Sequence, residues 1–217
     1  MRGLFVSFEG PDGVGKTTQA KLLASRLQAL KHDVVLTREP GGTQLGLAVR
    51  HWLLGVQVGS GSAVQEPLTW EAEVLLLAAD RAQHVKHVIK PALERGAIVV
   101  CDRYVDSSLA YQGWAAGRSD EVVREINQLA IQGLLPDITF LLAIPPQACY
   151  SRGRELDQIE QRGLDFQQRV YEGYLALARE TPRIQLLSVA GESREFVAAT
   201  IWANCLKRWP WLEQSAN

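Results

Sequence analysis

Several features that would direct a sequence toward other classes of protein are missing from this chain of 217 residues. No run of 18 apolar residues occurs, so the sequence predicts no transmembrane helix. Cysteine is scarce, and Cys101, Cys149 and Cys205 are odd in number and scattered, which argues against a disulfide framework or a Cys-x-x-Cys metal site. The formal net charge is only −1, so the composition predicts no broad attraction to nucleic acid or to an anionic membrane.

We expect no targeting segment at the start of the chain, because the first predicted strand follows Met1 to Gly3 directly. We therefore expect a reducing, cytoplasmic compartment. Neither an internal repeat nor a low-complexity tract is present. Hydrophobic residues make up 47% and charged residues 22% of the chain, and its length suits one α/β domain spanning residues 1–217.

Short apolar runs alternate with helical spacings along the chain. The apolar runs predict five strands, at 4–8, 33–36, 97–101, 137–144 and 183–189. The spacings predict helices after residue 17 and after Pro146, and at 43–54, 69–93, 119–132, 164–180 and 194–207. Such alternation implies right-handed βαβ units. The predicted fold is therefore α/β, an open parallel five-stranded sheet with helices on both faces.

Two stretches of this pattern need separate comment. The first half of the 69–93 helix is apolar nearly all round, which predicts burial on two sides, including against a second subunit. Pro91 is expected either to bend the later part of that helix or to open a new one. Residues 55–65 are rich in glycine and serine and predict a surface loop.

One loop carries a specific phosphate-binding pattern. Residues 10–18 read Gly10-Pro11-Asp12-Gly13-Val14-Gly15-Lys16-Thr17-Thr18, which matches G-x-x-x-x-G-K-[ST] between a predicted strand and a predicted helix. In this pattern the glycines let backbone N–H groups close around phosphate oxygens, the lysine supplies charge to the outer phosphates, and the Thr17 hydroxyl can reach Mg²⁺. The alternative is a glycine-rich turn that binds no ligand.

Charged residues also follow the next two predicted strands, as Arg38-Glu39 and as Asp102-Arg103. Ligands of open parallel sheets bind at the carboxyl ends of the strands, where these residues should meet the P-loop. The sequence therefore predicts a nucleoside triphosphate on the P-loop and a second anionic ligand, held by arginines, beside it. On sequence alone, Asp102 and Arg103 could instead form a surface salt bridge.

Longer motifs carry a resemblance to a known family. The chain contains F-E-G-x-D-G-V-G-K-T-T, T-R-E-P-G-G-T, A-A-D-R, D-R-Y with S-x-x-A-Y-Q behind it, P-D-x-T, E-L-D-Q-I-E, and the segment from Phe166 to Tyr174. From about residue 4 to 205 it resembles the thymidylate kinases, within the P-loop nucleoside monophosphate kinase fold. The resemblance is to the type with lid arginines rather than a P-loop arginine. It implies transfer of the γ-phosphoryl group of ATP to dTMP, giving dTDP for dTTP synthesis, with Mg²⁺ and in a homodimer.

The resemblance also implies roles for individual residues. The P-loop from Gly10 to Thr18 would hold the phosphates of ATP, with Lys16 and Asp12 acting in catalysis and Asp12 near the acceptor sugar. Thr17 and Asp102 would serve Mg²⁺. The residues that would bind dTMP are Arg38 and Arg103 at its phosphate, Arg81 at the thymine edge, and Leu77, Ser108, Tyr111 and Gln112 along its sugar and base. A polar lid at about 151–163 would supply a catalytic arginine, Arg154 or, next, Arg152.

Three positions depart from the family pattern. Leu77 stands where an aromatic residue usually stacks on the base, Ala143 where the strand often ends in an aspartate, and Gln158 where the lid usually has an arginine. The first bears on affinity for thymine, and the last on which lid arginine is catalytic. The phosphate-binding positions are complete.

Plainer interpretations remain open for several residues. Arg81 could lie on a helix surface, Tyr111 could be a core aromatic, and Glu39 could support Arg38 or the turn. The four histidines show no metal-ligand spacing and are expected to be structural or exposed, and residues 209–211 are either a packed tail or an interface patch.

Three other functions compete with dTMP phosphorylation. They are phosphorylation of another nucleoside monophosphate, a P-loop GTPase switch, and nucleotide binding with weakened catalysis. The GTPase lacks support, because no N-K-x-D motif occurs in the chain.

Overall fold

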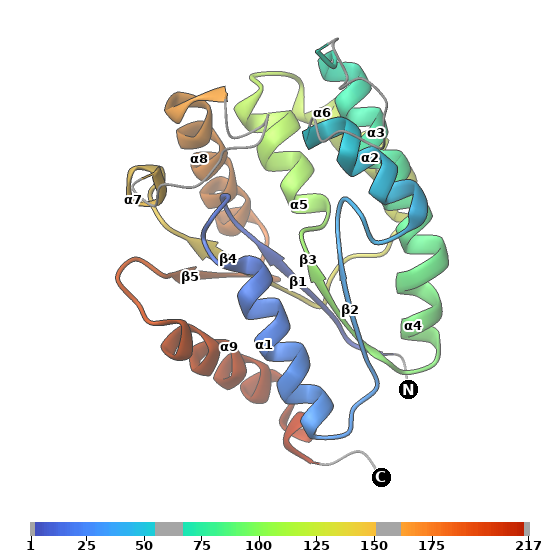
Figure 1. Ribbon diagram of the computed structural model, residues 1–217, viewed down its shortest axis with the longest axis vertical. Helices are drawn as coiled ribbons and strands as arrows, with labels where there is room; N and C mark the ends of the chain where they lie inside the picture. Colours follow the sequence, from blue (N-terminus) through green and yellow to red (C-terminus); the bar gives the residue numbers. More distant parts are fainter. Residues whose placement is uncertain (1–2, 55–66, 151–161, 215–217) are drawn as a thin grey trace, which may run out of the picture.

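Five parallel strands form the central sheet of the protein, in the order β2-β3-β1-β4-β5 (Figure 1). The computed structural model describes residues 3–54, 67–150 and 162–214. The strands are β1 Phe5–Glu9, β2 Val34–Arg38, β3 Ile98–Asp102, β4 Ile138–Ala143 and β5 Ile184–Ser188. The sheet predicted from the apolar runs is confirmed, with strand bounds that differ by one or two residues.

Helices cover both faces of this sheet (Figure 1). They are α1 Lys16–Ala29, α2 Gln44–Leu54, α3 Trp70–His84, α4 Lys90–Glu94, α5 Val105–Ser108, α6 Asp120–Ile131, α7 Pro146–Tyr150, α8 Leu164–Glu180 and α9 Arg194–Arg208. Two π-helical segments, η1 Val85–Ile89 and η2 Leu109–Ala115, and a short 3-10 helix, η4 Pro210–Glu213, complete the described elements. None of the helices in the described ranges is long and apolar enough to cross a membrane.

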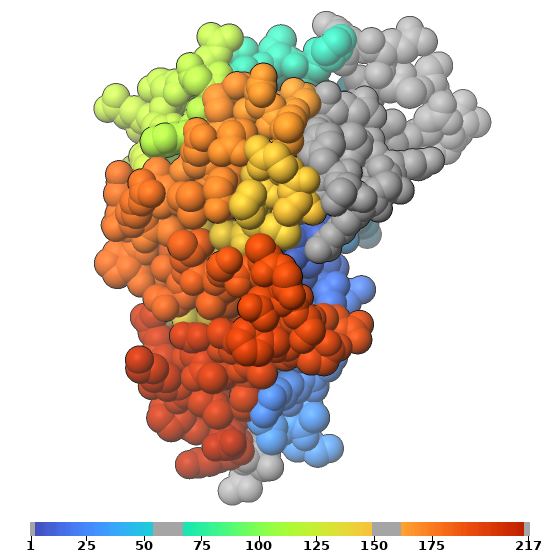
Figure 2. All heavy atoms as spheres, turned by 90° about the vertical axis from the view of Figure 1, so that its left-hand side faces the viewer, coloured from blue at the N-terminus to red at the C-terminus, as the bar shows by residue number. Residues whose placement is uncertain are grey.

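The core is built from the two faces of the strands, because successive side chains of a strand point to opposite sides. Val6 and Phe8 pack in the cluster that includes α1 and α9, whereas Phe5 packs on the other face with η1 and α4. A third cluster joins η2 and α8 over Leu141 of β4. Figure 2, which views the molecule from the left-hand side of Figure 1, shows α8 above α9, with α1 beside α9. The layers leave the carboxyl ends of β2, β3 and β1 side by side.

The helix after β3 was not predicted from the sequence. Residues 105–115 form α5 and η2, where the sequence analysis assigned no element between Tyr104 and Ser119. The widened π turns of η2 do not follow the 3.6-residue period, so hydrophobic spacing gives no helical signal there. This helix carries Ser108, Tyr111 and Gln112 to the edge of the sheet where the P-loop lies.

The helix predicted at 69–93 is continuous but not uniform, since α3 passes through η1 into α4. Pro91 falls in the first turn of α4, which is one of the two expected placements. Of the apolar residues in the first half, Val74 and Ala78 are buried, while Leu75 is 56% exposed. The predicted second buried face is therefore open within this single chain.

Some predictions can be followed only in part. The loop predicted at 55–65 and lid residues 151–161 lie outside the described residues. In the tail, Trp209 packs against the core cluster of α1 and α9, whereas Trp211 is 46% exposed and its ring makes a T-shaped contact with the ring of His32. The tail is thus packed at one tryptophan and exposed at the other.

Candidate functional site

The P-loop wraps from the end of β1 to the start of α1. Gly10 and Gly15 have φ values of 138° and 101°, which glycine adopts without strain. A Cβ atom at Gly10 would lie 2.3 Å from the carbonyl oxygen of Leu142, so only glycine lets the loop pass β4 this closely. Helix α1 begins at Lys16 with no acidic residue in its first turn, which leaves its N-terminal N–H groups suited to an anion.

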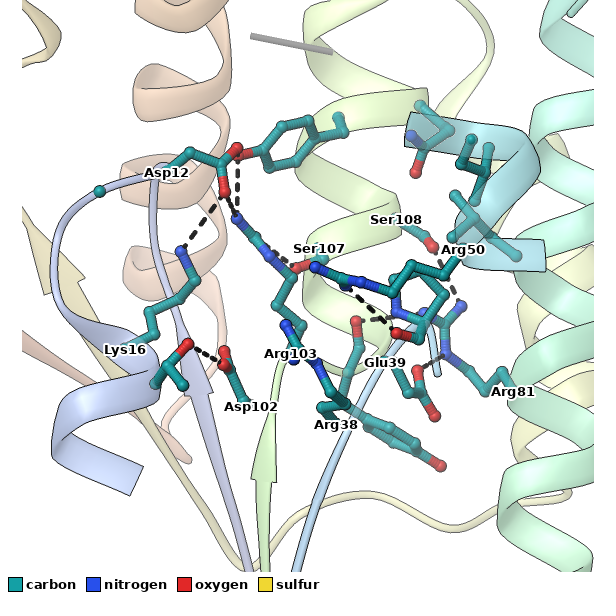
Figure 3. Close-up of a pocket in the computed structure, with 18 of the residues that line it drawn as sticks. Asp12, Lys16, Arg38, Glu39, Arg50, Arg81, Asp102, Arg103, Ser107 and Ser108 are labelled. Carbon is teal, nitrogen blue, oxygen red and sulfur yellow. Dashed lines mark hydrogen bonds and ion pairs between the residues drawn. The ribbon is translucent and has the colours of Figure 1, made fainter. Parts of the chain in front are cut away.

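A cavity of about 510 Å³ opens beside the P-loop. Its walls come from the P-loop, the loop after β2, α2, α3 and the segment from the end of β3 into η2. Every non-glycine site residue predicted outside the lid lines it except Pro11 and Val14: Asp12, Lys16, Thr17, Thr18, Arg38, Leu77, Arg81, Asp102, Arg103, Ser108, Tyr111 and Gln112. Figure 3 shows Asp12, Lys16 and Arg103 pointing toward one another in this space. The structure therefore brings three strand ends together, as the parallel topology predicts.

Asp12 and Arg103 form the ion pair at the centre of the cavity. Tyr111 donates its hydroxyl to the other oxygen of Asp12 at 2.8 Å. Burial acts to raise the pKa of Asp12, but the Arg103 and Lys16 cations outweigh it and hold that pKa well below its usual range. Asp102 and Arg103 do not form the surface salt bridge left open by the sequence.

The side chain of Lys16 folds back onto the P-loop. Its Nζ donates to the carbonyl of Pro11 at 2.6 Å and lies 3.8 Å from Asp12 Oδ1. Burial and repulsion from Arg103 lower the pKa of Lys16 to about 8, against the opposing effect of the nearby carboxylates. The amine is still protonated in most molecules at neutral pH, so it offers a desolvated cation to an incoming phosphate.

Glu9, the last residue of β1, is a site residue for which the sequence analysis gave no role. Its buried carboxylate accepts from the Tyr104 amide at 2.7 Å, from Ser107 Oγ at 2.6 Å and from the Tyr174 hydroxyl at 2.9 Å. Burial and the Asp106 charge raise the pKa of Glu9 to about 7, despite Arg103. Glu9 thus anchors the backbone next to Arg103. The available signal was an acid ending a strand in which Ser7 is the one other polar residue.

Thr17 and Asp102 bring two oxygen donors together. The Thr17 hydroxyl donates to Asp102 Oδ2, joining the start of α1 to the end of β3 (Figure 3). Hydroxyl and carboxylate oxygens are the ligands that Mg²⁺ prefers, and this ion commonly takes only one or two from protein and the rest from phosphate and water. No cluster of three or more His, Cys, Asp or Glu side chains that could hold a metal occurs in the part of the chain that the structure describes. The pair therefore fits a metal held jointly with a nucleotide.

Arginines from β2 and α2 line the other side of the cavity. Arg38, the last residue of β2, pairs in register with Asp102 of β3. Its Nε is buried without a hydrogen-bond partner among the described residues. Arg50 of α2, which the sequence analysis did not select, also lines the cavity. It donates a hydrogen bond to the Pro40 carbonyl at 3.3 Å. A helical arginine outside the matched motifs gave no signal of its own.

Arg81 is held by the protein rather than lying on a helix surface. It is 1% exposed, and its Nε donates to Glu39 Oε2 at 2.8 Å while Nη1 donates to Ser108 Oγ at 3.0 Å and to Asn127. Glu39 therefore supports Arg81, not Arg38 as one interpretation had it. Glu39 also pairs with the buried His84 at 2.9 Å, so this histidine is structural, as expected.

The far end of the cavity is lined by α3 and the helix after β3. Leu77 lies one turn before Arg81 on α3, and both line the cavity with Ser108 and Gln112. Tyr111 serves two purposes, since its ring packs edge-on against Phe166 with centroids 6.3 Å apart while its hydroxyl reaches Asp12. Tyr111 therefore packs as an aromatic of the core and also lines the cavity, and its contact with a nucleotide stays a prediction.

Of the arginines in the predicted lid, Arg152 and Arg154 lie outside the described residues. Arg162 is described, and its guanidinium pairs with Glu73 of α3 and lies 5.1 Å from the Phe166 ring.

Comparisons with known proteins show the family of the chain. A model of the family described as thymidylate kinase matches residues 8–201. A thymidylate kinase of Synechococcus sp. (strain JA-3-3Ab) is 48% identical over 92% of this chain and 94% of its own length. One of Bifidobacterium longum (strain DJO10A) is 49% identical over 93% and 96%. The crystal structure of thymidylate kinase from Ehrlichia chaffeensis superposes with a TM-score of 0.75 at 33% identity, over 94% of this chain and 98% of that one. The chain belongs to the thymidylate kinase family.

Proposed function

We propose that the cavity aligns ATP, bound on the P-loop, with dTMP bound between Arg38, Arg103 and α3, so that the γ-phosphoryl group passes directly from one to the other. Family membership makes the chain a kinase that forms dTDP from dTMP and ATP, a step in dTTP synthesis. The observation that carries the residue assignment is the meeting of a P-loop lysine with two arginines from neighbouring strand ends in one cavity.

The phosphate of dTMP is assigned to Arg38 and Arg103. Arg38 has a buried Nε without a partner in the described residues, and a guanidinium fork suits a phosphate. Arg103 is fixed by Asp12, Ser107 and the Gly10 carbonyl. Asp12, held between Arg103 and Tyr111, lies where it can orient the acceptor sugar and the arginine together.

Mg²⁺ is assigned to Thr17 and Asp102, whose oxygens fit it. When bound, the ion supplies positive charge to phosphate oxygens. The chain itself contributes the positive charge of Lys16, an amine that burial has already desolvated. Little covalent help is needed, because phosphoryl transfer depends chiefly on alignment and charge neutralisation.

The transition-state arginine is assigned to the lid, because Lys16 is the only basic residue between Gly10 and Thr17. Arg154 is preferred and Arg152 is second. Arg162 is the weakest candidate, since Glu73 and Phe166 already engage its guanidinium. On this assignment the arginine would come from the lid, as in thymidylate kinases whose P-loop lacks an arginine.

A homodimer is the proposed assembly. Leu45 and Trp52 of α2, Leu75 of α3 and Leu129 of α6 are 45%, 51%, 56% and 83% exposed. The three helices lie together at one end of the molecule in Figure 1. A second copy would cover the apolar side chains of this layer.

A coupled assay of ADP release with a panel of nucleoside monophosphates tests the assignment. We expect ATP turnover with dTMP to exceed turnover with dCMP, dGMP, AMP and UMP, and to require Mg²⁺. Faster turnover with another member of the panel would identify a different acceptor, and binding of ATP without any turnover would favour the catalytically weakened alternative.

A further inference from the structure

Gln112 makes two hydrogen bonds to side chains in the first turn of α3. Trp70 Nε1 donates to the backbone carbonyl of Gln112 at 2.7 Å, and Gln112 Nε2 donates to Glu73 Oε1 at 2.6 Å. Trp70 and Glu73 are three residues apart, so they lie on one face of the helix. Gln112 and Glu73 are each only 3% exposed. The position and the side-chain direction of Gln112 are therefore both set by α3.

The chemistry of Glu73 decides which end of the Gln112 carboxamide faces it. A carboxylate accepts hydrogen bonds and donates none, so it takes the amide nitrogen and not the amide oxygen. Its second oxygen, Oε2, accepts from Arg162. With both oxygens used as acceptors, Glu73 gives the carboxamide one orientation.

The amide oxygen is then left for the cavity. Gln112 lines the cavity together with Leu77 and Arg81, which follow Glu73 at one and two turns along α3. Over residues 3–54, 67–150 and 162–214, no donor reaches Gln112 Oε1. A buried side chain that lines the cavity thus has one acceptor left for a ligand, while Glu73 holds its amide nitrogen.

We propose that Glu73 is a specificity-determining positioning residue, which fixes the Gln112 oxygen toward the base and so selects a pyrimidine that carries N–H at ring position 3. Thymine has that donor. A cytosine-type ring has an acceptor at the same position, and two acceptors facing each other would leave both unpaired. Sites built around a buried hydrogen bond reject analogues that cannot make it far more strongly than apolar contacts do. The inference rests on the proposed function and on the contact between thymine and Gln112 that the family resemblance implies.

The matched substrates for the test are dTMP and 5-methyl-2′-deoxycytidine monophosphate, which differ only at ring position 3 and the substituent at position 4. In Glu73→Gln the neutral amide can either donate or accept, so the Gln112 carboxamide can turn. We expect the ratio of kcat/KM for dTMP to that for the methylcytidine nucleotide to fall at least tenfold. The change should come from a higher KM for dTMP and a lower KM for the methylcytidine nucleotide, with kcat for dTMP nearly kept.

Trp70→Phe is the matched comparison, because it removes the hydrogen bond to the Gln112 carbonyl and leaves the Glu73 carboxylate. It should change KM for both nucleotides alike and keep the ratio within about twofold of wild type, and a fall in the ratio as large as that of Glu73→Gln would overturn the proposal. The double variant Glu73→Gln with Gln112→Glu exchanges donor and acceptor and restores a fixed acceptor toward the base, so selectivity should return. A ratio unchanged in folded Glu73→Gln overturns the proposal. If that variant does not fold, equal use of both substrates by the double variant overturns it, and recovered selectivity supports it. A wild type that does not phosphorylate dTMP would contradict the proposed function instead, whatever the variants do.

Discussion

The buried pair of Arg81 and Glu39 should be far more important for stability than its geometry alone suggests. Arg81 Nε and Glu39 Oε2 are 2.8 Å apart, and both side chains are 2% exposed. Glu39→Gln leaves a guanidinium in the interior without its counter-charge, and breaking a buried pair from one side costs about 3–5 kcal/mol. For a chain of this size each kcal/mol lowers Tm by roughly 2–4 °C, so we expect a fall of about 6–20 °C.

Asp33→Asn is the matched control, because Arg95 Nε and Asp33 Oδ2 are also 2.8 Å apart but their side chains are 49% and 56% exposed. An exposed pair contributes about 0–1 kcal/mol, so Tm should fall by less than about 4 °C. Thermal unfolding followed by circular dichroism gives both values. Only Glu39→Gln should also raise the KM for dTMP, because Arg81 lines the cavity. Equal shifts in Tm for the two variants would refute the reasoning from burial.

Three further predictions follow from single residues. Leu77→Phe should lower the KM for dTMP on the order of tenfold in steady-state kinetics, since an aromatic face adds about 1–3 kcal/mol of stacking; a raised KM would mean that the cavity is packed around leucine. Arg154→Ala should lower kcat on the order of 10³-fold with little change in KM, and near-normal kcat would exclude it as the transition-state arginine. The pKa of Glu9 is about 7 in the folded chain against an ordinary 4.5, so its contribution to stability falls as pH rises through that interval. Glu9→Gln should therefore flatten the curve of Tm against pH between those values, and a curve parallel to wild type would contradict the shift.

The sequence predicted those parts of the site that fixed spacing and parallel topology determine. Gly10 to Thr18 form the P-loop by local pattern alone, and the ends of β2 and β3 meet it because parallel strands share one carboxyl edge. Arg38, Asp102 and Arg103 therefore reach the same cavity. The role of each residue in binding stays a prediction, which the kinetics of its variants would test.

What the sequence did not predict depends on contacts between distant elements. Glu9 acts through Tyr104 and Tyr174, which are close to it only once α5 and α8 are packed on the sheet. The hydrogen bond from Arg81 to Asn127 forms only when α6 lies against α3. The helix of residues 105–115 was not predicted, because its π turns depart from the 3.6-residue hydrophobic period on which the prediction depends. Such features are tertiary and leave no mark in local spacing.

Transfer of labelled phosphate from [γ-³²P]ATP, with separation of the products, tests the central claim most directly. With the wild-type chain, dTMP and Mg²⁺, the label should appear in dTDP. With Lys16→Ala, folded as judged by an unchanged Tm, the rate should fall below about a tenth of wild type, because the P-loop lysine neutralises charge on the phosphates. Label released only as free phosphate, or dTDP formed by Lys16→Ala at more than a tenth of the wild-type rate, would contradict the account.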